Sequence, residues 1–138
     1  MEDIRYAIVK QTDSARILEL YKAAGWWGKT ANQDDIKVVD SIVSQSFCFV
    51  IALLDDEIIG MGRAISDGVS DAYIQDVTVW QEYRGRGYGK GIVRHLIGYL
   101  KDRKIGWIGL ISEPGYERFY NGLGFKVMQD YTPFLLGE

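Results

Sequence analysis

The densest group of basic side chains in the chain lies within a glycine-rich segment, residues 81–91. Its core alternates basic residues with glycine and consists of Arg84, Gly85, Arg86, Gly87, Tyr88, Gly89 and Lys90. Glycine lets the backbone turn with its amides pointing inward, and a helix that begins at such a turn adds partial positive charge from its unpaired N–H groups. The segment therefore predicts a cradle for a phosphate or pyrophosphate. The simpler alternative is a glycine-rich turn with solvated arginines.

Spacing distinguishes this segment from two common phosphate-binding motifs. A nucleoside-triphosphate loop requires G-x-x-x-x-G-K-S/T, but the interval from Gly85 to Gly89 is one residue short and Gly91 takes the place of the hydroxyl. A dinucleotide motif, G-x-G-x-x-G, would need glycine where the chain has Lys90 or Ile92. We therefore expect neither kind of nucleotide site.

The period of the apolar residues predicts the elements that position this segment. Strand-like spacing occurs at residues 5–10, 47–54, 57–66, 72–79, 107–112 and 125–131. Helical spacing follows Thr12–Ser14 and Asn32–Asp35, and it occurs again at residues 90–103 and 115–121. The order β-α-α-β-β-β-α-β-α-β predicts one α/β domain over residues 1–138 with a mixed sheet. We expect an antiparallel meander over residues 47–79 and a right-handed parallel crossover over residues 72–112.

Composition narrows the partners and the compartment. The 138 residues carry a formal net charge of −3, which argues against nucleic-acid binding because that affinity comes mainly from neutralised phosphates. One cysteine cannot form an internal disulfide, and no Cys/His group has the spacing of metal ligands. The acidic N-terminus does not resemble a signal peptide, and no apolar run approaches the ~20 residues that cross a bilayer. We expect a cytoplasmic protein with no metal and no membrane partner.

Two motifs resemble those of the GNAT superfamily of acyl-CoA-dependent N-acetyltransferases. Residues 84–89, Arg-Gly-Arg-Gly-Tyr-Gly, resemble its Q/R-x-x-G-x-G/A motif. Residues 113–125 are similar to its Phe-Tyr-x-x-x-Gly-Phe segment, which follows the next strand. The expected order of elements also matches that fold, and the resemblance extends over roughly residues 47–125.

The resemblance implies acetyl-CoA as co-substrate. It implies that residues 84–90 bind the pyrophosphate, and that strand 72–79 splays from strand 107–112 so that the pantetheine arm lies in the opening. The arm would then pair with backbone groups around Val77 and Val79, and a backbone N–H there would polarise the thioester carbonyl.

Tyr120 matches the tyrosine that protonates the leaving CoA sulfur in this family. A phenol with a pKa near ~10 keeps its proton at neutral pH and can give it to a thiolate whose conjugate acid has a pKa near ~8.5. The alternative is a core tyrosine packed beside Phe119. No Cys–His or Ser–His pair is apparent, which favours direct attack by a primary amine of a small molecule. A protein or peptide amine, or a CoA-binding module with little turnover, are the alternatives.

The general base is not assigned by the resemblance. Some members carry Glu or His at the positions of Tyr73 and Gln75, and neither residue is a good base. Strand alternation places Asp76 on the face opposite Tyr73, Gln75 and Val77, roughly diagonal to Arg63, which predicts a structural ion pair. A water chain or an already neutral amine would then replace a dedicated base.

Aromatic residues suggest where the acceptor binds. Trp26 and Trp27 precede a glycine in a segment without period, and they could form an aromatic wall for an apolar or cationic amine beside Tyr73 and Gln75. Alternatively, one of the two tryptophans packs under the loop.

Three further features have expected roles outside the active site. His95 lies beside the apolar stripe of its helix and is expected at the surface. Cys48 lies between two phenylalanines on a strand and is expected in the core. The run Phe134-Leu135-Leu136 is apolar enough to seek a partner surface, and we expect a homodimer.

Overall fold

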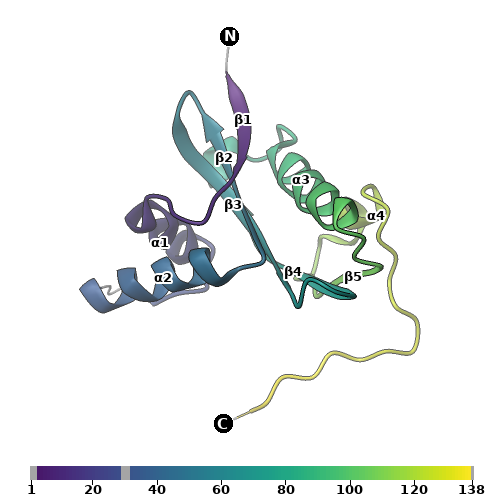
Figure 1. Ribbon diagram of the computed structural model, residues 1–138. Coiled ribbons are helices and arrows are strands. Elements are labelled where there is room, and N and C mark those ends of the chain that lie inside the picture. The colour runs from purple at the N-terminus through teal and green to yellow at the C-terminus, as the bar shows by residue number, and fades with distance from the viewer. Residues whose placement is uncertain (1–2, 29–31, 138) are drawn as a thin grey trace.

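Five strands form one sheet in chain order, β1-β2-β3-β4-β5, with helices on both faces (Figure 1). The computed structural model describes residues 3–28 and 32–137. β1 to β4 pair antiparallel, and β4 pairs with β5 in parallel. The predicted meander and parallel crossover are confirmed. The elements are β1 (Ile4–Ile8), α1 (Ser14–Ala23), α2 (Gln33–Gln45), β2 (Cys48–Leu54), β3 (Glu57–Ser66), β4 (Asp71–Val79), the 3-10 turn η1 (Gln81–Tyr83), α3 (Tyr88–Asp102), β5 (Trp107–Leu110) and α4 (Glu117–Asn121).

Both faces of the sheet are buried by helices. Residues of β2 alternate between the two cores: Phe49 and Ile51 pack under α1 and α2, whereas Val50 and Ala52 pack under α3. Side-chain caps fix where the first two helices begin. Asp13 accepts a hydrogen bond from the Arg16 amide at α1, and a reciprocal capping box opens α2. Within the described residues, no helix is long and apolar enough to cross a membrane.

A β-bulge in β4 changes which of its residues face α3. Met61 pairs with Thr78 but Arg63 pairs with Gln75, so β4 has one residue more than β3 over this interval. Asp76, within the bulge, has a φ of 58°. Before it, Ala72 and Ile74 are in the core under α3; after it, Val77 and Val79 pack against that core.

The bulge corrects two expectations from simple alternation. Asp76 does not lie on the face opposite Gln75, because the Arg63 guanidinium donates to both side chains. Val77 does not share a face with Tyr73 and Gln75, because the extra residue reverses the alternation between Gln75 and Val77.

β4 and β5 separate along their length, as the resemblance implied. Their register runs from Asp71 opposite Trp107 to Ile74 opposite Leu110, where β5 ends. β4 continues to Val79. In the part of the chain that the structure describes, no strand therefore lies beside residues 75–79 on that side of β4.

The strand expected at residues 125–131 is absent. Beyond α4, residues 125–137 contain no helix or strand, and Figure 1 shows this segment running away from the sheet to the C-terminus. Phe125 still packs against the core, but the large apolar side chains from Val127 onward are exposed; Phe134, Leu135 and Leu136 are each more than 90% exposed. Alternating apolar residues predict a strand only where a neighbouring edge is available for pairing, and this segment does not pair with β5.

Candidate active site

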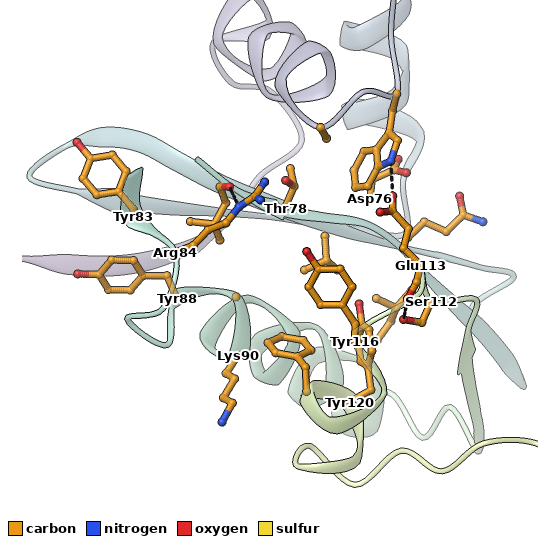
Figure 2. Close-up of a pocket in the computed structure, with 18 of the residues that line it drawn as sticks. Asp76, Thr78, Tyr83, Arg84, Tyr88, Lys90, Ser112, Glu113, Tyr116 and Tyr120 are labelled. Atoms are coloured by element: carbon orange, nitrogen blue, oxygen red, sulfur yellow. Dashed lines mark hydrogen bonds between the residues drawn. The ribbon is translucent and has the colours of Figure 1, made fainter. Parts of the chain in front are cut away.

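A cavity of about 590 Å³ lies where β4 and β5 separate. The far end of β4, the glycine-rich turn, the first turn of α3, the segment after β5 and the end of α1 all contribute to its walls. Figure 2 shows Arg84 and Tyr88 at one end, Glu113 and Ser112 at the other, and Tyr116 and Tyr120 between them. The cavity therefore joins a basic, glycine-rich end to an acidic and aromatic end.

Most of the residues predicted to bind the donor line this cavity. Arg86 is the exception: its guanidinium lies over the Tyr83 ring, 5.6 Å from the ring centre, and it does not border the cavity. The predicted residues that do line it are Val77, Val79, Arg84, Gly85, Gly87, Tyr88, Gly89 and Lys90.

Backbone conformation explains the glycines of this turn. Gly85 and Gly87 have φ values of 82° and 87°, a region that side-chain-bearing residues rarely adopt. Gly87 is the N-cap of α3 and provides no capping side chain. The first amides of this 15-residue helix thus begin at the cavity wall, where the helix dipole favours an anion. The Arg84 Nε donates to the Val79 carbonyl (2.9 Å), which ties the turn to the end of β4.

Tyr120 lies on α4 and borders the cavity. Its ring contacts Phe119 and Phe125 edge-on, with ring centres 4.9 Å and 5.8 Å apart. Burial raises the pKa of Tyr120, and Tyr116 and Glu113 nearby raise it further. The phenol therefore keeps its proton at neutral pH and can donate it to a group in the cavity.

Asp76 lines the cavity and belongs to a compact hydrogen-bonded group. Its Oδ2 accepts from the Arg63 Nε (2.7 Å) and from the Tyr21 hydroxyl (2.7 Å), and both charged side chains are largely buried. Burial, followed by the Asp76 carboxylate, raises the pKa of Tyr21, so Tyr21 is the proton donor of that contact. The predicted Arg63–Asp76 ion pair is confirmed. A carboxylate with two donors on one oxygen is a structural anchor rather than a free base.

The residues expected around the acceptor divide into two groups. Trp26 and Gln75 line the cavity. Trp27 packs instead on Tyr21, with ring centres 5.5 Å apart, and Tyr73 packs on Trp107 at 5.0 Å outside the cavity.

The cavity also contains residues that the sequence analysis did not single out as site residues: Thr78, Ser112, Glu113 and Tyr116. Glu113 and Tyr116 belong to the segment that carries the second motif, so their position in that segment could have identified them. The Trp26 indole donates to Glu113 Oε1 (2.8 Å) and joins two walls of the cavity.

The two residues expected to be structural lie where they were predicted. His95 is exposed and stacks on Tyr6, with its Nδ1 2.8 Å from the Gly91 carbonyl oxygen. Cys48 is fully buried, and burial raises the pKa of its thiol to about 11. Residues 3–28 and 32–137 contain no group of three or more His, Cys, Asp or Glu that could hold a metal ion.

Comparison with known proteins identifies the family. The sequence model described as "Acetyltransferase (GNAT) family" matches residues 8–125. A GCN5-related N-acetyltransferase 2, chloroplastic, of Arabidopsis thaliana is 43% identical over 72 residues, which are 52% of this chain and 28% of that protein. An uncharacterized N-acetyltransferase ycf52 of Pyropia yezoensis is 28% identical over 90% of this chain and 71% of its own length.

The fold of a solved structure agrees with this. A GNAT-family acetyltransferase from Streptococcus pneumoniae superposes with a TM-score of 0.81 over 100% of this chain and 98% of that chain, at 24% identity. The glycine-rich turn, the separated strands and the matched sequence range thus lead to one conclusion: the chain belongs to the GNAT family of acetyltransferases and is an acyltransferase.

Proposed function

We propose that this protein transfers an acetyl group from acetyl-CoA to a primary amine of a small molecule. The observation that supports this most directly is the single cavity that runs from the N-terminus of α3 to Tyr120 between the separated strands. Direct attack needs no covalent enzyme intermediate: the neutral amine nitrogen bonds to the acyl carbon and gives up a proton to solvent, the C–S bond breaks, and the sulfur takes a proton.

The donor end of the cavity suits CoA. The amides of the first α3 turn and the side chains of Arg84 and Lys90 would bind the pyrophosphate. Arg86, which lies over the Tyr83 ring outside the cavity, would add positive charge beside it. Among the described residues, no strand pairs with residues 75–79 on the β5 side, so backbone groups around Val77 and Val79 are open to the pantetheine arm. The Val79 carbonyl already accepts from Arg84 and keeps one further lone pair for this contact. CoA supplies the activated thioester.

Tyr120 would serve as the proton donor to the leaving sulfur. Its raised pKa keeps the phenol protonated, and Phe119 and Phe125 fix its ring. We assign no general base, because Asp76 already accepts from Arg63 and Tyr21. The acceptor amine would lose its proton to solvent before it attacks.

A small-molecule acceptor is favoured over a protein amine by the closure of the acceptor end. The bond from Trp26 to Glu113 connects the end of α1 to the segment after β5, two regions on opposite sides of the cavity. A polypeptide would have to displace this bridge, whereas a small amine could enter beside it.

Calorimetric titration with CoA tests the donor site. Arg84→Ala, Arg86→Ala and Lys90→Ala should each weaken binding by up to about fivefold in Kd, and the loss should shrink in high salt, because exposed charge pairs contribute roughly 0.2–1 kcal/mol and are screened. Lys101→Ala is the matched control, since Lys101 is exposed in the last turn of α3, away from the cavity. Unchanged affinity in the three variants together would refute the assignment.

Acetyl transfer to a panel of amines, compared with acetyl-CoA hydrolysis in their absence, separates an enzyme from a CoA-binding module. An enzyme should release CoA faster with at least one amine. Equal release with and without every amine would favour the module.

We also propose a homodimer, supported by the exposure of the C-terminal segment. Phe134, Leu135 and Leu136 are 91%, 97% and 96% exposed, and such a contiguous apolar run is typical of an interaction surface. Light scattering should show twice the chain mass for the wild type and the chain mass after all three are changed to serine. A wild-type monomer at every accessible concentration would overturn this proposal.

The cytoplasmic location expected from the sequence remains a proposal. Its support is the single, fully buried cysteine, while the Arabidopsis relative is named as chloroplastic. Fractionation of the source cells would separate the two compartments.

A further inference from the structure

Glu113 is the carboxylate at the acceptor end of the cavity whose charge is not compensated. Two acidic side chains line this cavity, Asp76 and Glu113. Asp76 is neutralised by the Arg63 guanidinium at 2.7 Å. In the part of the chain that the structure describes, Glu113 forms no ion pair, and its carboxylate accepts a hydrogen bond only from the neutral Trp26 indole.

The cations of the cavity lie at its other end and do not pair with this carboxylate. Arg84 and Lys90 belong to the glycine-rich turn and the first turn of α3, at the opposite end from Glu113 (Figure 2). Neither forms a salt bridge with it. The acceptor end therefore has a negative potential that attracts a cation and repels an anion.

Two aromatic side chains line the same cavity as this carboxylate. Trp26 donates to Glu113, and Trp26 and Tyr116 are 38% and 45% exposed, so both rings are available to a ligand. Aromatic rings bind apolar groups and also attract cations. A ligand that satisfies both features carries a positive charge next to an apolar or aromatic body.

The carboxylate also lies close to the candidate proton donor. Glu113 and Tyr120 line the same cavity, and the Glu113 carboxylate contributes, after burial and Tyr116, to the raised pKa of Tyr120. An ammonium group bound at Glu113 would thus be held close to the place where the acyl group must react.

We propose that Glu113, positioned by Trp26, selects arylalkylamines that carry no carboxylate and rejects the corresponding α-amino acids. This inference rests on the proposed acetyl transfer and specifies its acceptor. The protonated amine binds against the Glu113 carboxylate with its ring beside Trp26 and Tyr116, then loses its proton to solvent. An α-amino acid would place a second carboxylate against Glu113, and like charges at that distance repel.

Phenethylamine and phenylalanine form a matched pair for the test, because they differ only in the carboxylate. We expect the wild type to have the higher kcat/KM with phenethylamine. Glu113→Gln should lower that value about tenfold, mainly through KM, the typical effect of losing a charge-assisted hydrogen bond. The fall in kcat/KM with phenylalanine should be smaller, so the ratio of the kcat/KM for phenethylamine to that for phenylalanine should decrease. The amide oxygen of glutamine can still accept from Trp26, so the fold should be retained.

Two further variants control the experiment. Glu117→Gln removes the same charge four residues away, outside the cavity, and should leave the preference unchanged. Glu113→Asp keeps the charge one methylene shorter and should restore part of the preference.

The possible failures are distinguishable. If the wild type acetylates no amine at all, the proposed function is wrong and this inference with it. The inference alone is overturned if the wild type acetylates other amines but not phenethylamine, if Glu113→Gln leaves the preference unchanged, or if it lowers kcat without raising KM.

Discussion

Replacing Tyr120 with phenylalanine should separate donor binding from proton transfer. The ring contacts with Phe119 and Phe125 remain, and no hydrogen bond to the Tyr120 hydroxyl occurs among the described residues. Removing the hydroxyl therefore leaves no partner unsatisfied, and the free energy of unfolding should change by less than about 1 kcal/mol. CoA affinity should also be retained, because the glycine-rich turn is unchanged.

Turnover should respond differently, because the leaving thiolate loses its proton donor. General acid catalysis typically contributes ~10²–10⁴-fold, so kcat should fall by that range at saturating acetyl-CoA. The pH dependence provides a second readout. Since burial raises the pKa of Tyr120 above its ordinary value near ~10, the wild-type rate should decline from loss of this proton only above that pH. The variant should lack that alkaline decline.

The controls use two other tyrosines. Tyr131→Phe changes a residue that is 74% exposed and outside the cavity, and it should leave kcat unchanged. Tyr116→Phe changes the other tyrosine of the cavity; a larger fall there than at position 120 would move the role to Tyr116. Wild-type turnover in Tyr120→Phe, with chemistry shown to limit the rate, would leave water as the proton donor.

Three further predictions concern stability and reactivity. An ideal Cβ on Gly91 would lie 2.0 Å from the Tyr6 hydroxyl oxygen, whereas one on Gly98 meets nothing within 4 Å. The free energy of unfolding of Gly91→Ala, measured by thermal unfolding, should therefore be lower than that of Gly98→Ala by more than about 1 kcal/mol. The reverse order would contradict the packing. Asparagine tolerates the positive φ of 58° at position 76, so Asp76→Asn changes mainly the charge and leaves the largely buried Arg63 guanidinium without its anion. The free energy of unfolding in urea should fall by about 1–2 kcal/mol. No loss would mean that the ion pair is not stabilising. Cys48, with its pKa raised to about 11, should have about one thiolate in a thousand at pH 8 and react with a thiol reagent only as the protein unfolds, so rapid labelling of the native protein would contradict its burial.

Local signals in the sequence were sufficient to predict most of the fold. The period of the apolar residues located β2, β3 and β4, and the capping residues Asp13 and Asn32 located the first two helices. Each of these signals acts within a few residues. The glycine-rich turn could also be predicted from the sequence, because the positive φ values at positions 85 and 87 favour glycine.

What the sequence did not reveal depends on contacts between distant segments. Trp26 and Glu113 are 87 positions apart, and nothing in either segment alone indicates their hydrogen bond. Tyr73 was grouped with the acceptor residues, but the parallel pairing of β4 and β5 brings its ring against Trp107 instead. The strand expected at residues 125–131 fails for the same reason, because a strand also needs an edge with which to pair.

The bulge at Asp76 connects these observations physically. One extra residue turns Val77 and Val79 toward α3, at the point where β4 no longer has β5 beside it. The positive φ of Asp76 also turns its carboxylate toward Tyr21 of α1. Trp26 follows the end of α1 at Ala23 by three residues and packs on Tyr21. The hydrogen bond between Tyr21 and Asp76 therefore also fixes the position of Trp26. A single backbone irregularity thus sets both the donor edge of the cavity and the position of the residue that bonds to Glu113, which is why neither end could be placed by alternation alone.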